Sequence, residues 1–343
     1  PFVSVVDAGA ERSLSRSVSR DPTIRAGECV LPRAAAFSAS RGALLVACLG
    51  SDAVVELDAR GIRMSRLELR RWQVPKGPTG IVVDAQKNRA VVWSQFDASI
   101  STLALDDAGA LASISVPARK EHAMIADVAH GRLLFHAIGD KRLSKDGRAC
   151  ASCHPDGRDD ALTWQTPDGA RQTIMLAGRV DGTAPFSWSG KNATVEKHLE
   201  STLARLGGTG LGENDAADKR ALLAYVRTLT PPPSGPAPLA DRVLVARGEK
   251  LFDDAAQGCA TCHAGGGTDH HAHEVDLQVV GARVGEAFDT PSLRFVGGTA
   301  PYFHDGRFAT LDELLSSPDH AMGSSLHLSR DERVALSAYL ETL

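Results

Sequence analysis

Two short motifs constrain what this chain folds into. Residues 150–154 read Cys-Ala-Ser-Cys-His and residues 259–263 read Cys-Ala-Thr-Cys-His, so both have the form C-x-x-C-H. In this pattern two thiols form thioethers to a porphyrin, and the adjacent histidine reaches the iron from one side. A lone motif also suits half of a zinc site, but two copies favour two covalently bound c-type haems. The residues expected to hold them are Cys150, Cys153, His154, Cys259, Cys262 and His263.

The remaining cysteines and the composition indicate where such a chain works. The chain has 343 residues, enough for two to three domains, and its net charge of −4 gives no reason to expect nucleic acid as a partner. It has no run of 18 apolar residues, so we expect no membrane span. Cys29 and Cys48 are the two cysteines outside the motifs. They form a disulfide in an oxidising compartment or stay separate thiols. Covalent haem favours the periplasm.

The first 128 residues have the pattern of an all-β region. Short apolar runs recur between turn signals, as expected for strands; they cover residues 3–6, 43–47, 53–57, 80–83, 90–93 and 100–103. The spacing resembles that of β-propeller blades, which take ~40–45 residues each. The region therefore predicts roughly three propeller-like blades, at that spacing.

Three blades are too few to close a propeller, which needs about four. We therefore expect the chain to be the C-terminal portion of a longer polypeptide, with the missing blades on a companion fragment. The alternative is that residues 1–128 pack as an open sheet.

Residues 129–343 repeat internally and have helical patterns. The first copy, 129–230, contains the first motif, then Gly-Thr-Ala-Pro at 182–185 and an apolar helix at 221–229. The second copy, 241–343, has the second motif, Gly-Thr-Ala-Pro at 298–301 and a helix at 335–343. A proline-rich linker, 231–240, separates them. Capping boxes at 310–313 and 329–332 mark helix starts. The buried face of the last helix is expected to carry Val334, Leu336, Leu340 and Leu343. We interpret the repeat as two all-α, cytochrome c-like domains related by duplication.

The two copies differ where a second iron ligand would lie. Met322 of the second copy aligns with Leu206 of the first. A methionine opposite a histidine is a common axial pair, and it raises the haem potential. Met322 is thus the candidate sixth ligand of the second haem, with His320 as a rival and plain core packing as the alternative.

Three further residues are candidates near the haems. His198 occupies the position of Leu314 and could ligate the first iron, move a proton of peroxide, or be an exposed helix residue. Trp188 aligns with His304 just after the Gly-Thr-Ala-Pro turn, where a side chain could lie between the haems. Arg307 is a candidate partner of a haem propionate, or else forms a surface ion pair.

Residues 129–343 resemble the bacterial di-haem cytochrome c peroxidase and MauG superfamily. The motifs that carry the resemblance are Arg142–Gly147, Trp188 in a W-x-G context, Thr290–Arg294 and Thr299–Leu311. The resemblance implies that the first haem meets peroxide, that the second stores electrons with Met322 as ligand, and that Trp188 lies between them. It also implies a calcium ion between the domains, held near Thr299 and Pro301.

The sequence departs from the family pattern at several positions. His198 stands where the peroxidases carry a glutamine, and Gly208 stands where they carry a catalytic glutamate, with Glu213 nearby but off register. Gln172 replaces the asparagine expected at the calcium site, and residues 155–197 contain no histidine that could serve as a removable ligand of the first haem.

These observations favour a periplasmic di-haem oxidoreductase of peroxidase type. It would reduce hydrogen peroxide at the first haem, with His198 as acid and base, and receive electrons from a small redox protein through the second haem and Trp188. One alternative is MauG-like oxidation of a partner protein or an organic substrate. Another is a non-catalytic di-haem electron-transfer protein, in which both irons are six-coordinate.

Overall fold

The computed structural model describes residues 2–7, 12–18, 29–60, 68–106, 111–116, 125–231, 242–277 and 286–343. The chain divides into two compact units. One consists of residues 1–149 with 206–209, and the other of residues 150–205 with 210–343. Apart from residue 231, the predicted proline-rich linker lies outside the described residues.

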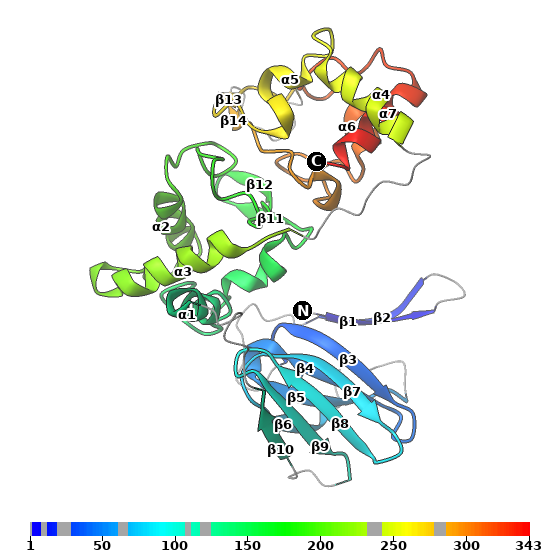
Figure 1. Ribbon diagram of the computed structural model, residues 1–343, viewed down its shortest axis with the longest axis vertical. Coiled ribbons are helices and arrows are strands. Elements are labelled where there is room, and N and C mark those ends of the chain that lie inside the picture. The colour runs from blue at the N-terminus through cyan, green and yellow to red at the C-terminus, as the bar shows by residue number, and fades with distance from the viewer. Residues whose placement is uncertain are drawn as a thin grey trace. The chain divides into compact units, whose positions relative to one another are not determined.

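The first unit is built mainly from antiparallel strands (Figure 1). A hairpin, β1 and β2, is followed by two four-stranded meanders whose strands pair in chain order. The strands are β1 (Phe2–Asp7), β2 (Arg12–Val18), β3 (Pro32–Ser38), β4 (Ala43–Cys48), β5 (Ala53–Asp58), β6 (Glu68–Gln73), β7 (Pro78–Asp84), β8 (Arg89–Ser94), β9 (Ser99–Ala104) and β10 (Leu111–Ser115). The all-β prediction is confirmed, and every predicted apolar run lies within a strand.

The two meanders share an apolar core. Along β8 the buried residues Ala90 and Val92 alternate with more exposed ones, because successive side chains of a strand point to opposite faces. Val92 packs in one buried cluster with Leu45, Trp72 and Leu103, which brings the β3–β6 sheet against the β7–β10 sheet. Strands β3–β10 thus form two four-stranded sheets, each about as large as a propeller blade. The repeat length of the sequence predicts roughly three blades.

The opposite face of the β7–β10 sheet carries exposed apolar side chains. Val82 is 59% exposed and Ile114 is 66% exposed. Trp93 pairs with Ile100, which in turn pairs with Ile114, so these residues form one row across three strands. An apolar row of this kind is typical of a surface that meets another protein surface.

Cys29 and Cys48 form a disulfide, as expected for a pair of cysteines in an oxidising compartment. The bond ties the segment before β3 to the end of β4, and Cys48 lies in a small buried cluster with Val46 and Val55. Closing a loop of this length restricts the unfolded chain and stabilises the fold by roughly 3 kcal/mol.

A helix that sequence alone assigns to the first haem domain belongs to the β unit. Helix α1 (Ala126–Phe135) is grouped with residues 1–149, whereas the predicted domain boundary lies at residue 128. The reason is packing against the strand loops. The Arg132 guanidinium donates to the Gln95 carbonyl and lies 4.9 Å from the ring of Phe96, which also contacts His136.

The second unit holds both haem motifs. Its first copy contains a hairpin and two helices: β11 (Thr163–Thr166), β12 (Gly169–Gln172), α2 (Val195–Arg205) and α3 (Ala216–Thr228). Its second copy contains α4 (Arg242–Asp253), α5 (Cys259–Cys262), β13 (Ala272–His273), β14 (Phe288–Asp289), α6 (Leu311–Ser316) and α7 (Arg330–Leu340). Both copies appear in green to red in Figure 1.

Helices α4 and α7 pack closely in the second copy. A Cβ atom at Gly248 would overlap the Ala335 carbonyl, so glycine permits the close approach. Both predicted capping boxes are present, at Thr310 and Ser329. Val334, expected on the buried face, is 44% exposed. No helix among the described residues is long and apolar enough to cross a bilayer.

A buried charge lies inside the β unit and generates a test of its stability. Glu56 is fully buried and accepts from Arg41 and Arg70, each over 2.6 Å. Burial raises the pKa of Glu56, but the two arginines outweigh it and lower the pKa overall. We expect Glu56→Gln to lower the free energy of unfolding by about 3 kcal/mol, because it leaves two guanidinium groups without their anion.

The control for this variant is Asp58→Asn, which removes a carboxylate from an exposed pair with Arg60 and should leave stability little changed. Chemical denaturation of the haem-loaded protein, followed by far-ultraviolet circular dichroism, measures both variants. Because the pKa of Glu56 is lowered on folding, its contribution is present above the unfolded pKa and is lost as the pH falls through the folded value. Equal effects of the two variants would contradict a structural role for the buried charge.

Candidate haem site

The two C-x-x-C-H segments fold into the same turn. In each, the histidine N–H donates to the carbonyl of the first cysteine, over 2.9 Å at His154 and 3.1 Å at His263. The chain then enters left-handed conformations two residues later, at Asp156 and Gly265. The internal repeat seen in the sequence is therefore a repeat of backbone structure.

Each motif histidine is oriented by a carbonyl four residues further on. The Nδ1–H of His154 donates to Arg158 over 3.2 Å, and the Nδ1–H of His263 donates to Gly267 over 3.4 Å. This leaves Nε2 of each ring with its lone pair, as a metal-ligating histidine requires. Burial lowers the pKa of both rings, so both are neutral and able to ligate iron. The residues present fit a haem at each motif.

The zinc alternative finds no support in this geometry. Among the described residues, the group of side chains that converges as metal ligands is Cys262, Asp269 and His273. In that group His273 already donates to Asp269 over 2.7 Å. Neither motif brings its own two cysteines and histidine together in a metal-binding group among these residues.

His198 lies on α2 within electrostatic range of His154. Burial, together with the smaller effects of the charges of Arg205 and His154, lowers the pKa of His198 to about 4. The ring stacks on Phe186 at 6.2 Å, and its Nδ1 lies 3.3 Å from the Asn192 side-chain nitrogen. His198 is therefore a partly buried, neutral imidazole on the side of the first motif, and the exposed alternative does not describe it.

Trp188 lies where the first copy meets the second. Its indole N–H donates to the Gln172 carbonyl over 2.8 Å, and its own carbonyl accepts from Asp289 of the second copy over 2.9 Å. The indole and the ring of His304 meet edge to face, with their centroids 6.4 Å apart. The aligned aromatic residues of the two copies thus meet each other.

His304 is held by a network of charged groups. It is 5% exposed, stacks on Phe288 at 3.8 Å and donates from Nε2 to Asp276 over 3.0 Å. The Arg307 guanidinium donates to Asp276 through both terminal nitrogens and to Asp305 through Nε. Arg307 therefore has carboxylate partners within the protein, and its role toward a haem propionate stays a prediction.

Met322 lies over the second motif. It packs in the cluster that includes Cys259 and Phe308. At the neighbouring Gly323, which has a positive φ, a Cβ atom would come within 2.6 Å of the Gln257 carbonyl, so the chain passes close to the motif. The rival ligand His320 uses both ring nitrogens, donating to Leu314 and accepting from the Met322 N–H. Met322 remains the candidate sixth ligand.

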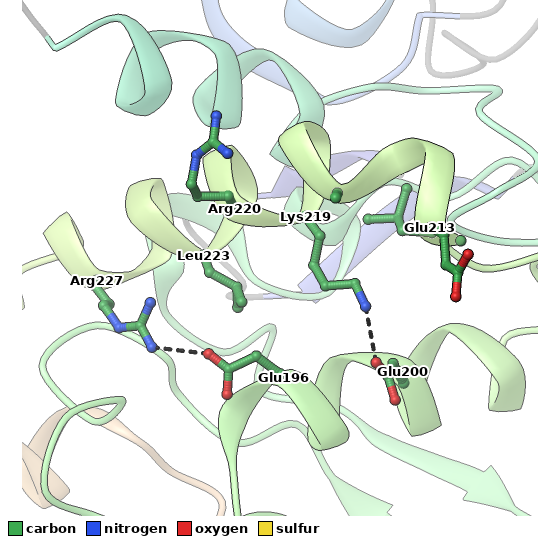
Figure 2. A pocket seen from close by; sticks show the side chains of 10 residues that line it. Glu196, Glu200, Glu213, Lys219, Arg220, Leu223 and Arg227 are labelled. Atoms are coloured by element: carbon green, nitrogen blue, oxygen red, sulfur yellow. Dashed lines mark hydrogen bonds and ion pairs between the residues drawn. The ribbon is translucent and has the colours of Figure 1, made fainter.

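The position of the expected catalytic glutamate holds no side chain. A Cβ atom at Gly208 would overlap the Arg142 carbonyl. Glu213 instead lines an open groove of about 640 Å³ between α2 and α3. Figure 2 shows Glu196 paired with Arg227, and Glu200 with Lys219, across this groove.

The groove and His198 belong to opposite faces of α2. Glu196 and Glu200 are four residues apart and share one helix face, whereas His198, two residues from each, lies on the other. Glu213 therefore does not replace the missing acid beside His198.

At the predicted calcium site, a side-chain hydrogen bond already uses one of the carbonyl oxygens. Gln172 is buried, and its side-chain N–H donates to the Thr299 carbonyl over 2.9 Å. Calcium requires that such a carbonyl point its lone pairs at the ion among other oxygen ligands. Since a carbonyl oxygen has two lone pairs, this bond leaves one of them for an ion, and calcium at the Thr299–Pro301 turn stays a prediction.

The structure thus brings His198 near His154, Met322 near the second motif, and Trp188 against His304. Sequence reasoning missed Asn192 and Asp276. Asn192 aligns with Phe308, so comparing the two copies could have found it. No sequence pattern indicates the role of Asp276, because its partners His304 and Arg307 lie about 30 residues further along the chain.

Comparisons with known proteins agree with these features. Residues 245–343 match the Cytochrome c family. The chain is 30% identical over 298 residues to methylamine utilization protein MauG of Methylorubrum extorquens, covering 67% of this chain and 81% of that protein. It is 26% identical over 276 residues to hydrazine synthase subunit gamma of Kuenenia stuttgartiensis, covering 63% and 77%.

A solved structure of hydrazine synthase from Kuenenia stuttgartiensis, pressurized with xenon, has the same fold. The TM-score is 0.54 at 20% identity, and the match covers 66% of this chain and 89% of that chain.

The hydrogen bonds of Gln172 generate a prediction about the junction between the copies. Gln172→Ala should lower the free energy of unfolding of the second unit by about 2 kcal/mol, because the buried Thr299 carbonyl loses its donor. Gln165→Ala, on the exposed side of the neighbouring strand, should have little effect. A calcium chelator should leave the unfolding midpoint of the wild type unchanged. A lower midpoint in chelator would show that the turn holds calcium.

Proposed function

Because the chain belongs to the bacterial di-haem cytochrome c peroxidase and MauG superfamily, we propose that it is a periplasmic di-haem oxidoreductase of peroxidase type. It reduces hydrogen peroxide at the first haem, with electrons relayed through the second. The observation that carries this proposal is His198, a neutral imidazole within electrostatic range of His154, where the second copy has Leu314.

The haems, when bound, supply the iron-centred redox chemistry. His154 and His263 offer Nε2 as ligands, and four cysteine thiols form the thioethers. Met322, which packs in the same cluster as Cys259, would hold the iron of the second haem through its thioether sulfur. A methionine ligand raises the potential, which suits a centre that stores electrons.

His198 manages the protons of peroxide. Because its pKa lies at about 4, the ring is neutral at pH 7, with a proton on one nitrogen and a lone pair on the other. The ring can take a proton from one peroxide oxygen and return it to the other, which becomes the leaving oxygen. This assignment does without the glutamate of the family pattern, whose position is Gly208.

Trp188 and His304 provide the contact between the copies. Their rings meet edge to face at 6.4 Å between centroids, and each ring donates one hydrogen bond, Trp188 to the Gln172 carbonyl and His304 to Asp276. Electrons reach the second copy from a small redox protein and pass to the first through this aromatic contact.

MauG-like oxidation of a partner protein is a second candidate. Two observations favour it: Gly208 leaves no room for the peroxidase acid, and the outer face of the β7–β10 sheet exposes an apolar row that includes Ile114. The relative that is 30% identical is named as a methylamine utilization protein MauG. In this case the β unit docks the substrate protein.

Replacing His198 tests the peroxidase assignment. We expect His198→Leu to lower the second-order rate constant for hydrogen peroxide by 10²–10³, roughly the usual contribution of a positioned acid–base group. The His198-dependent rate should also fall as the pH drops through about 4, because protonation removes the lone pair. Stopped-flow mixing of the reduced protein with peroxide measures both.

His271→Leu is the matched control, because His271 is exposed and its ring faces the Asp269 carbonyl. A wild-type rate in His198→Leu would remove His198 from the reaction, whereas a wild-type protein that does not react with peroxide would favour the electron-transfer alternative.

Replacing Met322 tests the division of labour between the haems. Met322→Leu gives the second copy the residue that the first has at Leu206. The second haem should lose its sulfur ligand, become high-spin in the ferric state and fall in reduction potential. A redox titration followed by absorbance reports both haems. Unchanged spectra and potentials would mean that Met322 only packs in the core.

A further inference from the structure

We propose that Asn192 is a positioning residue whose side-chain amide decides whether His198 presents a proton or a lone pair to the first haem. The inference rests on the proposed function, in which His198 faces that haem. Its structural basis is the contact between the Asn192 amide and Nδ1 of His198, 3.3 Å apart.

Asn192 is placed independently of His198. It lies in the turn after Gly-Thr-Ala-Pro, where its carbonyl accepts from Phe186 over 2.7 Å and its own N–H donates back over 3.4 Å. Phe186 from the same turn stacks on the imidazole. The turn therefore contacts His198 at one ring face, through Phe186, and at Nδ1, through Asn192. Nε2 remains available to interact with a ligand or with the haem iron.

The second copy shows that this pair is not needed for the fold. The corresponding turn has the same backbone pairing, with Tyr302 and Phe308 bonded over 2.7 Å and 3.4 Å. Phe308 stands at the position of Asn192 and Leu314 at that of His198, and both pack against apolar neighbours. Two polar residues that contact each other thus replace two apolar ones, in the first copy alone.

Hydrogen-bond polarity links the amide to the far nitrogen of the ring. A neutral imidazole carries one N–H and one lone pair. When the Asn192 N–H donates to Nδ1, as in this structure, the proton must be on Nε2. His198 is then a hydrogen-bond donor and no iron ligand. When the amide is rotated by half a turn, its oxygen accepts from Nδ1–H, and Nε2 carries the lone pair needed by a base or a ligand.

An amide is the side chain that allows both states. A carboxylate only accepts, so it would hold the proton on Nδ1 and the lone pair on Nε2 permanently. An aliphatic side chain directs neither nitrogen. Asn192→Asp and Asn192→Leu therefore separate the two functions, and both keep the backbone bonds of the turn.

Cyanide binding to the ferric holoprotein tests this without turnover. In the wild type, Nε2–H of His198 would donate a hydrogen bond to a cyanide bound at the first haem. We expect Asn192→Asp to raise the dissociation constant of cyanide roughly tenfold or more, and to increase the low-spin fraction of the first haem, because the Nε2 lone pair now competes for iron. Asn192→Leu should give a smaller change in affinity and no gain in low-spin signal.

Lys191→Gln is the matched control, because it makes the same change in net charge one residue away on an exposed side chain. Electron paramagnetic resonance and cyanide titration are run on all variants and on His198→Leu. If His198→Leu changes cyanide affinity while both Asn192 variants match the wild type, the role of Asn192 is overturned and the proposed function stands. If His198→Leu also binds cyanide like the wild type, His198 does not face the haem, and both proposals fail.

Discussion

The hydrogen bond from each motif histidine to a carbonyl four residues later is the constraint on which the second unit depends. It fixes Nδ1 as the protonated nitrogen of His154 and His263, so each ring has one nitrogen left to ligate iron. The bond requires a tight turn with left-handed residues directly after the motif. The rest of each copy, from the Gly-Thr-Ala-Pro turn to the helices, is arranged around this turn.

Equal scaffolds make the differences between the copies informative. The turn pairings and the motif backbones agree closely, so a changed side chain at an aligned position reflects a changed task rather than a changed fold. In the first copy, the polar residues Asn192 and His198 stand where the second copy has apolar residues. In the second copy, the thioether of Met322 stands at the position of Leu206 in the first. Each copy thus carries one feature that the other lacks.

Sequence predicted the features that are set locally. The strands, both capping boxes and the disulfide follow from periodicity, short-range hydrogen bonds and redox compartment. What it missed depends on contacts between distant segments. The contact between Arg132 of helix α1 and Phe96 spans 36 positions of the chain. Val334 is 44% exposed, whereas Leu336 and Leu340, which are predicted on the same face of α7, are buried. The bond from Gln172 to Thr299 spans 127 positions, and no local pattern encodes it.

Gln172 makes three hydrogen bonds at the junction between the two copies. One residue donates its backbone N–H to His304, accepts at its carbonyl from the Trp188 indole and donates its amide to Thr299. A shift of the Thr299 turn would therefore displace Gln172, whose carbonyl accepts the hydrogen bond from the Trp188 indole. Gln172 thus joins segments of both copies, and we expect a substitution there to disturb the contact between the two aromatic rings.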